Sequence, residues 1–222
     1  MSLESRKGAT LEDPGAEVVD QLSGFWERYG RVVLGAIGAI VVIAVVAVFT
    51  IRSNAKQEND ASKKLAEANL LFWQGDYDRS KTVAQEVTRT FGSTWSATDA
   101  HRIAGDDMFW RGDFKGAITE YNAYLAKQGS GLLADAVRRS LAYSLESDKK
   151  FADAAKLYDG LVGKFERESS AEFLAASARC LQANHQNDEA AKRLQRLLDE
   201  FGDTSYAARA RVQLAMIQPA TN

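Results

Sequence analysis

Few residues in this 222-residue chain stand out as able to do chemistry: one cysteine, two histidines and one pair of adjacent aspartates. Asp106 and Asp107 are neighbours, and neighbours on a helix point about 100° apart, so they are poorly placed to share a proton or a metal ion. We interpret them as a solvated or groove-lining face. His101 and His185 are isolated from each other. Cys180 lies in the apolar stretch AASARCLQA, which is typical of a small buried hydrophobe.

The remaining sequence lacks the motifs of common active sites. It contains no Gly-rich phosphate loop and no His-Glu-x-x-His pattern. A single cysteine excludes an internal disulfide framework and a multi-cysteine metal cluster. The net charge is −2, from 28 basic and 30 acidic residues, which argues against a strongly basic nucleic-acid binder. We therefore expect no enzyme, no cofactor, no metal, no nucleic-acid partner and no small-molecule substrate.

The elements that position these residues are predicted to be helices. The two prolines are Pro14 and Pro219, so about two hundred residues between them lack the strongest helix breaker. Hydrophobic residues make up 45% of the chain and charged residues 26%, which is a globular composition. The sequence therefore predicts an all-α protein.

One segment is far more apolar than the rest. Residues 32–51 read VVLGAIGAIVVIAVVAVFTI, without a charged residue, Asn, Gln or His. Twenty residues of helix span about 30 Å, the thickness of a bilayer core. We therefore predict a transmembrane helix over 32–51. The alternative is a cleaved signal peptide, with Ser53-Asn54-Ala55 as the cleavage site, but the run is long for that and Arg52 intervenes.

The segments on either side of this span are assigned by composition. Residues 1–31 form an N-terminal tail, in which AEVVDQLSGFWERYG, at 16–30, has apolar residues at helical spacing. This segment is either an amphipathic juxtamembrane helix or a simple extension of the transmembrane helix. Residues 52–60 are expected to be a linker. The flanking segments carry equal numbers of basic residues, so charge alone does not set the orientation.

Residues 61–217 contain a repeat. The anchors are Tyr77, Phe114, Phe151 and Asn187, at steps of 37, 37 and 36 residues. Small residues occur nine positions before each anchor: Ala68, Gly105, Ala142 and Ala178. Small residues let two helices approach closely, and a Gly-Asp pair before the first two anchors is typical of a turn between helices. The pattern predicts about four helical hairpins that stack on one another, followed by a C-terminal capping helix over 204–217.

The repeat resembles the tetratricopeptide repeat in its period and in its small, apolar and aromatic positions. It departs from that pattern at Lys64, His101 and Arg138, where a large apolar residue is usual. The whole layout, with FWERYGR before one span and then divergent repeats, resembles the YfgM-like family of ancillary SecYEG translocon subunits. This resemblance implies a bacterial inner-membrane protein with a cytoplasmic N-terminus and a periplasmic repeat domain. It also implies two partners, SecYEG and a periplasmic chaperone of the PpiD type.

The resemblance to tetratricopeptide repeats also implies a partner-binding groove lined by the first helix of each unit. Its positions here are Asn69, Phe72, Trp73, Arg102, Asp106, Phe109, Trp110, Arg139, Tyr143, Glu146 and Arg179. The aromatic pairs 72–73 and 109–110 are the sharpest feature, because each precedes a Gly-Asp turn one repeat apart. They could grip an apolar partner segment, with three arginines as polar anchors. The alternative is that one member of each pair belongs to the core between repeats.

Two functions remain open from the sequence. The first is a membrane-anchored protein–protein interaction scaffold at the translocon, which would hold chaperones or clients. The second is a structural or adaptor subunit of another bacterial envelope complex. A list of co-purifying membrane proteins would separate them.

Overall fold

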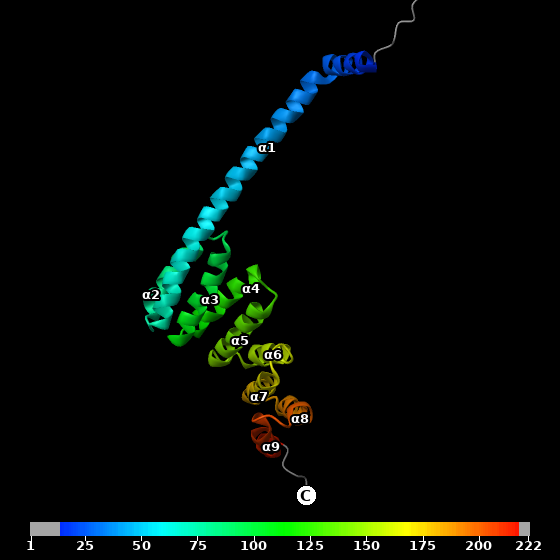
Figure 1. Cartoon of the computed structure of the whole chain (residues 1–222). Coiled ribbons are helices and arrows are strands. Elements are labelled where there is room, and N and C mark those ends of the chain that lie inside the picture. The colour runs from blue at the N-terminus through cyan, green and yellow to red at the C-terminus, as the bar shows by residue number, and fades with distance from the viewer. Residues whose placement is uncertain (1–13, 218–222) are drawn as a thin grey trace, which may run out of the picture. The chain divides into compact units, whose positions relative to one another are not determined.

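A computed structural model describes the backbone of residues 14–217 and the side chains from residue 22 to residue 217. The predicted tail before residue 14 lies outside this range. Within it the chain is helical and has no strand, which confirms the all-α prediction. The helices are α1 (Pro14–Trp73), α2 (Tyr77–Thr90), α3 (Trp95–Trp110), α4 (Phe114–Lys127), α5 (Leu132–Ser147), α6 (Phe151–Leu161), α7 (Arg167–Ala183), α8 (Asn187–Phe201) and α9 (Tyr206–Ile217) (Figure 1).

The turns between paired helices form where the repeat anchors predict them. Asp76 and Asp113 cap α2 and α4 by accepting a hydrogen bond from a backbone N–H three residues on. The preceding Gly75 and Gly112 have φ of 79° and 77°, a conformation that favours glycine. The third and fourth turns have Lys149 and His185 at the same positions, with φ of 61° and 59°. The four hairpins therefore share one turn geometry, although only two have the residue best suited to it.

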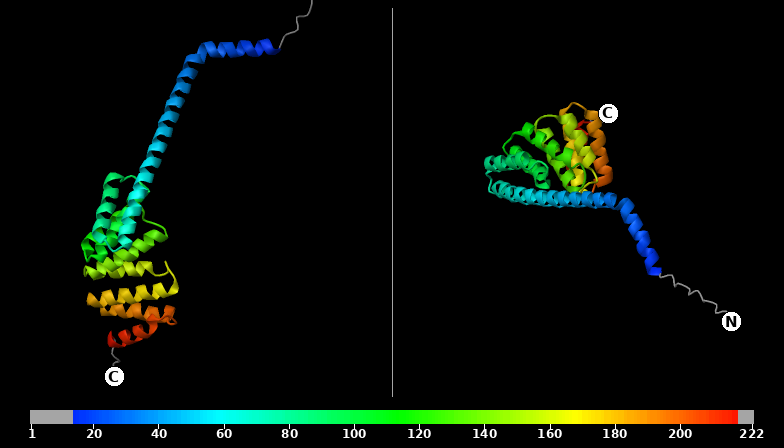
Figure 2. Two further views of the ribbon diagram at one scale, coloured as in Figure 1. Left: turned by 60° about the vertical axis from the view of Figure 1, so that its left-hand side comes forward. Right: turned by 90° about the horizontal axis from the view of Figure 1, so that it is seen from above.

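The helices from α2 to α9 pack on one another in chain order, as the stacked layers of Figure 2 show. The small residues predicted to line the helix contacts are buried: Ala68, Gly105, Ala142 and Ala178. A Cβ at Gly105 would lie 2.6 Å from the Tyr121 ring, so only glycine fits there. Larger buried side chains, among them Tyr158, Phe173 and Leu194, fill the core of the later hairpins. The capping helix α9 begins two residues later than expected.

Residues 52–60 were expected to be a linker. They are instead helical and continue α1 without a break. They contain no Gly or Pro, and they are followed by the strong helix formers of KKLAEA. Glu58 already belongs to the repeat region, since its carboxylate accepts hydrogen bonds from the backbone N–H groups of Trp95 and Ser96 at 2.8 and 3.0 Å. The repeat architecture therefore starts before residue 61.

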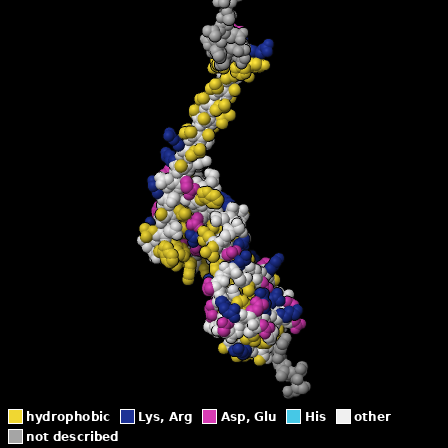
Figure 3. Space-filling view, turned by 45° about the vertical axis from the view of Figure 1, so that its right-hand side comes forward, with side chains coloured by type: hydrophobic (Ala, Val, Ile, Leu, Met, Phe, Trp, Pro, Cys, Tyr) yellow, Lys and Arg dark blue, Asp and Glu magenta, His cyan; other side chains and the backbone are white. Residues whose placement is uncertain are grey.

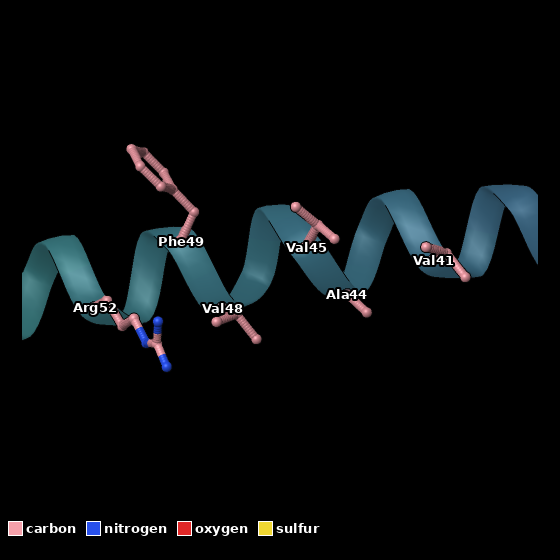
Figure 4. Close-up of a pocket in the computed structure, with 6 residues that line it drawn as sticks. All are labelled: Val41, Ala44, Val45, Val48, Phe49 and Arg52. Carbon is pink, nitrogen blue, oxygen red and sulfur yellow. The ribbon is translucent and has the colours of Figure 1, made fainter.

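The chain divides into two compact units, residues 1–55 and 56–222. In the first unit, α1 contains a stretch that is long and apolar enough to cross a membrane, with a mean hydropathy of 3.1 and no buried residue in its most apolar window. Hydrophobic side chains sheathe this stretch (Figure 3), and Val41, Val45 and Phe49 project outward from a single helix (Figure 4). Phe49 is 73% exposed. Such a surface is costly in water and favourable in lipid.

Candidate protein-binding groove

Four of the predicted groove residues surround one pocket of about 250 Å³ between α3, α4 and α5. The described residues that line it are Asp106, Phe109, Trp110, Tyr121, Ser140 and Tyr143. Tyr121 lies seven residues after the repeat anchor Phe114, on the second helix of its hairpin, and Ser140 gave no signal in the sequence. Of these residues, Tyr121 is almost fully buried, and Trp110 has 63% of its surface exposed.

Asp106 is the charged group of this pocket. It accepts hydrogen bonds from the Tyr121 hydroxyl at 2.7 Å and from the Arg102 guanidinium at 3.1 Å. Burial raises the pKa of Asp106 above its usual value, although these two bonds act in the opposite direction. Arg102 also pairs with Asp99 through two bonds of 2.8 and 3.1 Å. The guanidinium is therefore shared between two carboxylates.

Asp107 does not lie on the solvated or groove-lining face that was expected for the Asp106-Asp107 pair. Its side chain is fully buried, and neither carboxyl oxygen has a hydrogen-bond partner among the described residues. Burial raises the pKa of Asp107 to about 7. The nearby Ser80 hydroxyl donates to the Ala68 carbonyl oxygen at 2.9 Å. The same 100° between neighbours that separates the two carboxylates turns one toward the pocket and the other into the contact between α2 and α3.

The two aromatic pairs form part of a continuous row of rings. In each pair the phenylalanine is half-buried and packs on the first residue of the following helix, at centroid distances of 5.5 and 5.6 Å. The tryptophans are the exposed members, Trp73 at 81% and Trp110 at 63%. Tyr77 stacks on Trp110 at 6.4 Å and 10° and so joins the two repeats. This row, here called the aromatic ladder, consists of Phe72, Trp73, Tyr77, Phe109, Trp110 and Phe114.

The other predicted positions in the later repeats carry charge. Arg139 donates to Glu172 at 3.1 Å and to the Tyr143 hydroxyl at 2.8 Å. Glu146 takes the place that Phe109 has one repeat earlier, and it binds Arg179 at 2.6 Å. Burial alone would raise the pKa of Glu146, but the hydrogen bonds from Arg179 and Tyr158 lower it. The arginines expected as anchors for a partner are thus already held in ion pairs.

The predicted positions therefore fall into two halves. The first two repeats contribute the two aromatic pairs together with the Arg102–Asp106 ion pair, and the last two contribute Tyr143 and the ion pairs of Arg139 and Arg179. In one view of the surface, hydrophobic side chains gather over the early hairpins, whereas acidic and basic ones intermingle over the late ones (Figure 3). Asn69, in the first repeat, donates to the Leu65 carbonyl oxygen of its own helix at 3.2 Å.

The remaining residues singled out for chemistry have structural surroundings. His101 lies 2.7 Å from the Glu120 carboxylate, on the helix that follows. His185 is the turn residue with positive φ. Cys180 is buried, as expected, and burial raises the pKa of its thiol to about 12, which disfavours a reactive thiolate.

Comparisons with known proteins bear on the fold. No protein-family model and no curated protein matches the chain. Among solved structures, a tetratricopeptide repeat protein from Parabacteroides merdae is 12% identical, with a TM-score of 0.61, over 72% of this chain and 60% of that one. YrrB, a tetratricopeptide repeat protein described as having an unusual peptide-binding site, is 17% identical, with a TM-score of 0.56, over 70% and 74%.

A third structure, described as a kinesin light chain with nearly identical TPR-like repeats from Podosopora anserina, is 15% identical, with a TM-score of 0.57. It matches 72% of this chain and 86% of its own. At these identities the likeness concerns the fold alone. The repeat region of this chain therefore has the helical-hairpin architecture of tetratricopeptide-like repeat proteins.

Proposed function

We propose that this chain is a membrane-anchored scaffold for protein–protein interaction. The observation that carries the proposal is the aromatic ladder, whose two tryptophans are exposed and one of which, Trp110, lines a pocket. Exposed tryptophans are costly in water and are typical anchors at protein interfaces. The apolar stretch of α1 would hold the repeats at a membrane.

More specifically, we propose an ancillary subunit of the SecYEG translocon in the bacterial inner membrane. The N-terminus would be cytoplasmic and the repeats periplasmic, where they would link the translocon to a chaperone of the PpiD type or to emerging clients. The support for this assignment is the resemblance of the whole layout to the YfgM-like family. The role requires no catalysis, cofactor or metal.

A weak groove is sufficient for such a role. Two proteins confined to one membrane meet at a high effective concentration, so a modest affinity for each contact gives stable association. This favours a shallow aromatic surface over a deep, tightly binding cavity.

The experiment is an affinity purification in mild detergent with a tag after Asn222, followed by identification of the co-purifying membrane proteins. The test variant replaces both Trp73 and Trp110 by alanine. The control is Trp95→Ala, because Trp95 is 74% exposed at the other end of α3 and lies outside the aromatic ladder. We expect translocon subunits or a periplasmic folding factor with the wild type and with the control, and their loss from the test variant.

Other results would contradict different parts of the proposal. Recovery of a different stoichiometric envelope complex, without the translocon, would make the chain a structural or adaptor subunit of that complex. Unchanged recovery from the double variant would show that the aromatic ladder does not hold the partner.

A further inference from the structure

The carboxylates around the pocket beside the aromatic ladder outnumber the cations that pair with them. Its neighbourhood holds two carboxylates, Asp99 and Asp106, against the single guanidinium of Arg102. Arg139, whose guanidinium lies 5.6 Å from the centre of the Tyr143 ring, is balanced by its ion pair with Glu172. None of the six described lining residues carries a positive charge. With both carboxylates ionised, the charges of Asp99, Asp106 and Arg102 therefore sum to −1.

Asp106 also has unused capacity to accept hydrogen bonds. An ionised carboxylate offers about four lone-pair sites, and Asp106 uses one for Tyr121 and one for Arg102. The two remaining sites lie in a partly dehydrated position, because the side chain is only 22% exposed. A ligand that donates hydrogen bonds would satisfy them, whereas an apolar ligand would displace water and leave them empty.

The walls favour a positively charged donor over a neutral one. Besides Tyr121, the aromatic side chains of Phe109, Trp110 and Tyr143 line the pocket. The faces of aromatic rings carry partial negative charge and attract cations within about 6 Å. The chain already uses one of these rings in this way, since the Arg139 guanidinium lies 5.6 Å from the centre of the Tyr143 ring.

The size of the pocket limits the ligand. Pockets for drug-sized molecules usually measure about 300–1,000 Å³. At about 250 Å³ this one suits the end of a single long side chain. Trp110, one of its lining residues, is exposed and available to a segment lying across the helices.

We infer that this pocket receives a basic side chain, the guanidinium or ammonium group of an arginine or lysine, presented by the protein partner. The head group binds Asp106, and its stem lies against Trp110 and Phe109. This inference rests on the proposed scaffold function, and it adds the chemistry of the segment that is bound. A glutamate or aspartate would face the surplus negative charge and would be rejected.

The test uses the full-length protein in detergent and short immobilised peptides that differ at one central position: arginine, lysine, citrulline or glutamate. Citrulline has nearly the shape of arginine without its charge. We expect the arginine or lysine peptide to bind about tenfold more tightly than the citrulline peptide, and the glutamate peptide to bind least. Asp106→Asn should remove the difference between arginine and citrulline, because the amide still accepts from Tyr121 but lacks the charge.

Two tryptophan variants provide the matched comparison. Trp110→Ala should weaken binding of the arginine peptide several-fold, and Trp95→Ala, on the same helix and also exposed, should leave it unchanged. Both side chains are on the surface, so neither change should unfold the protein. Equal affinity for arginine and citrulline, no binding by any peptide at millimolar concentration, or discrimination that survives Asp106→Asn would overturn the inference.

The scaffold proposal is tested separately by a photo-reactive amino acid at position 73, outside the pocket. A cross-link from position 73 to a translocon subunit or chaperone, together with no discrimination among the peptides, would refute only the ligand class. Discrimination among the peptides without any protein cross-link would refute the scaffold and leave the basic-side-chain pocket standing.

Discussion

Asp106 and Asp107 are neighbours in sequence and have different environments. Asp106 is held by a tyrosine hydroxyl and a guanidinium at the edge of a pocket. Asp107 is fully buried without a described hydrogen-bond partner. Desolvation disfavours a carboxylate in such a place, so the proton is held more tightly in the folded state than in the unfolded state. Asp107 therefore makes the stability of the first hairpins depend on pH.

The first prediction concerns Asp107→Asn. The pKa of Asp107 is about 7 when folded and near 4 when unfolded, so between these values the folded state binds more protons. The contribution of Asp107 to the free energy of unfolding is therefore largest at low pH and is lost as pH rises to about 7. As pH rises from 5 to 8, the free energy of unfolding of Asp107→Asn should increase by about 2–3 kcal/mol relative to that of the wild type. Urea unfolding in detergent, followed by circular dichroism, measures this difference.

The test compares how the free energy of unfolding changes with pH in the wild type and in Asp107→Asn, because other carboxyl groups also titrate. Glu146 has a lowered pKa and affects the wild type and the variant equally. If the two stability curves run parallel from pH 5 to pH 8, the folded-state pKa of Asp107 is not raised.

The second prediction concerns Gly105→Ala. The added methyl would lie 2.6 Å from a ring carbon of Tyr121 on α4, so helix or ring must move. Overpacking of this kind costs about 1–3 kcal/mol. Because Tyr121 donates to Asp106, the variant should also disturb the pocket. The free energy of unfolding measures the first effect, and binding of the arginine peptide measures the second.

Gly160→Ala is the matched control for this substitution. Gly160 lies on α6, and a Cβ there would meet nothing within 4 Å. Alanine is the better helix former, so this variant should be stabilised by about 0.5–1 kcal/mol. Destabilisation by both substitutions would show that the effect at position 105 is not steric.

At the scale of elements, the four hairpin turns share a residue with positive φ. In two of them this residue is Lys149 or His185 in place of glycine. Non-glycine residues pay about 1–2 kcal/mol for left-handed geometry. Lys149→Gly removes that strain but loosens the unfolded chain, so the net gain should be about 0.5–1 kcal/mol. Gly112→Ala, at the equivalent turn, should destabilise by a similar amount. Urea unfolding of both variants checks the prediction, and a loss of stability in Lys149→Gly would contradict it.

The repeat elements were predictable because one spacing governs them. The anchors and the small residues recur at fixed distances, and close helix packing and tight turns need those residues. The groove was predictable only in part, since side-chain partners depend on two helices at once. The spacing places Tyr121 on the second helix of its hairpin, but its hydrogen bond to Asp106 depends on the rotation of both helices about their axes. The same holds for Arg139 and Arg179, whose acidic partners lie a full repeat away.

The linker was misjudged for a different reason. Residues 52–60 contain charged and small polar side chains, which are equally common in exposed helices and in connections. Only the contact of Glu58 with the start of α3 shows that this segment belongs to the repeats.

At the scale of the whole molecule, the prediction concerns the apolar stretch of α1. If it is a retained membrane anchor, the protein should stay in the membrane pellet after alkaline carbonate extraction and dissolve only in detergent. Intact-mass spectrometry of the purified protein should then give about the full 24.4 kDa of the chain. A mature protein that begins after residue 55 and is soluble would instead identify a cleaved signal peptide.

The small side chains between the first helices have a consequence for motion. Of the described buried residues in the first core, six are alanines: Ala61, Ala68, Ala84, Ala97, Ala100 and Ala104. Alanine buries little area, whereas the later core is filled by tyrosine, phenylalanine and leucine. In a stack of hairpins, each hairpin is stabilised by the apolar area that it buries against its neighbours. A hairpin that buries less area therefore unfolds locally at a lower free energy. Amide hydrogens of α2 should therefore exchange with deuterium before those of α7. The early hairpins, which carry the aromatic ladder, should thus unfold locally more readily than the late ones.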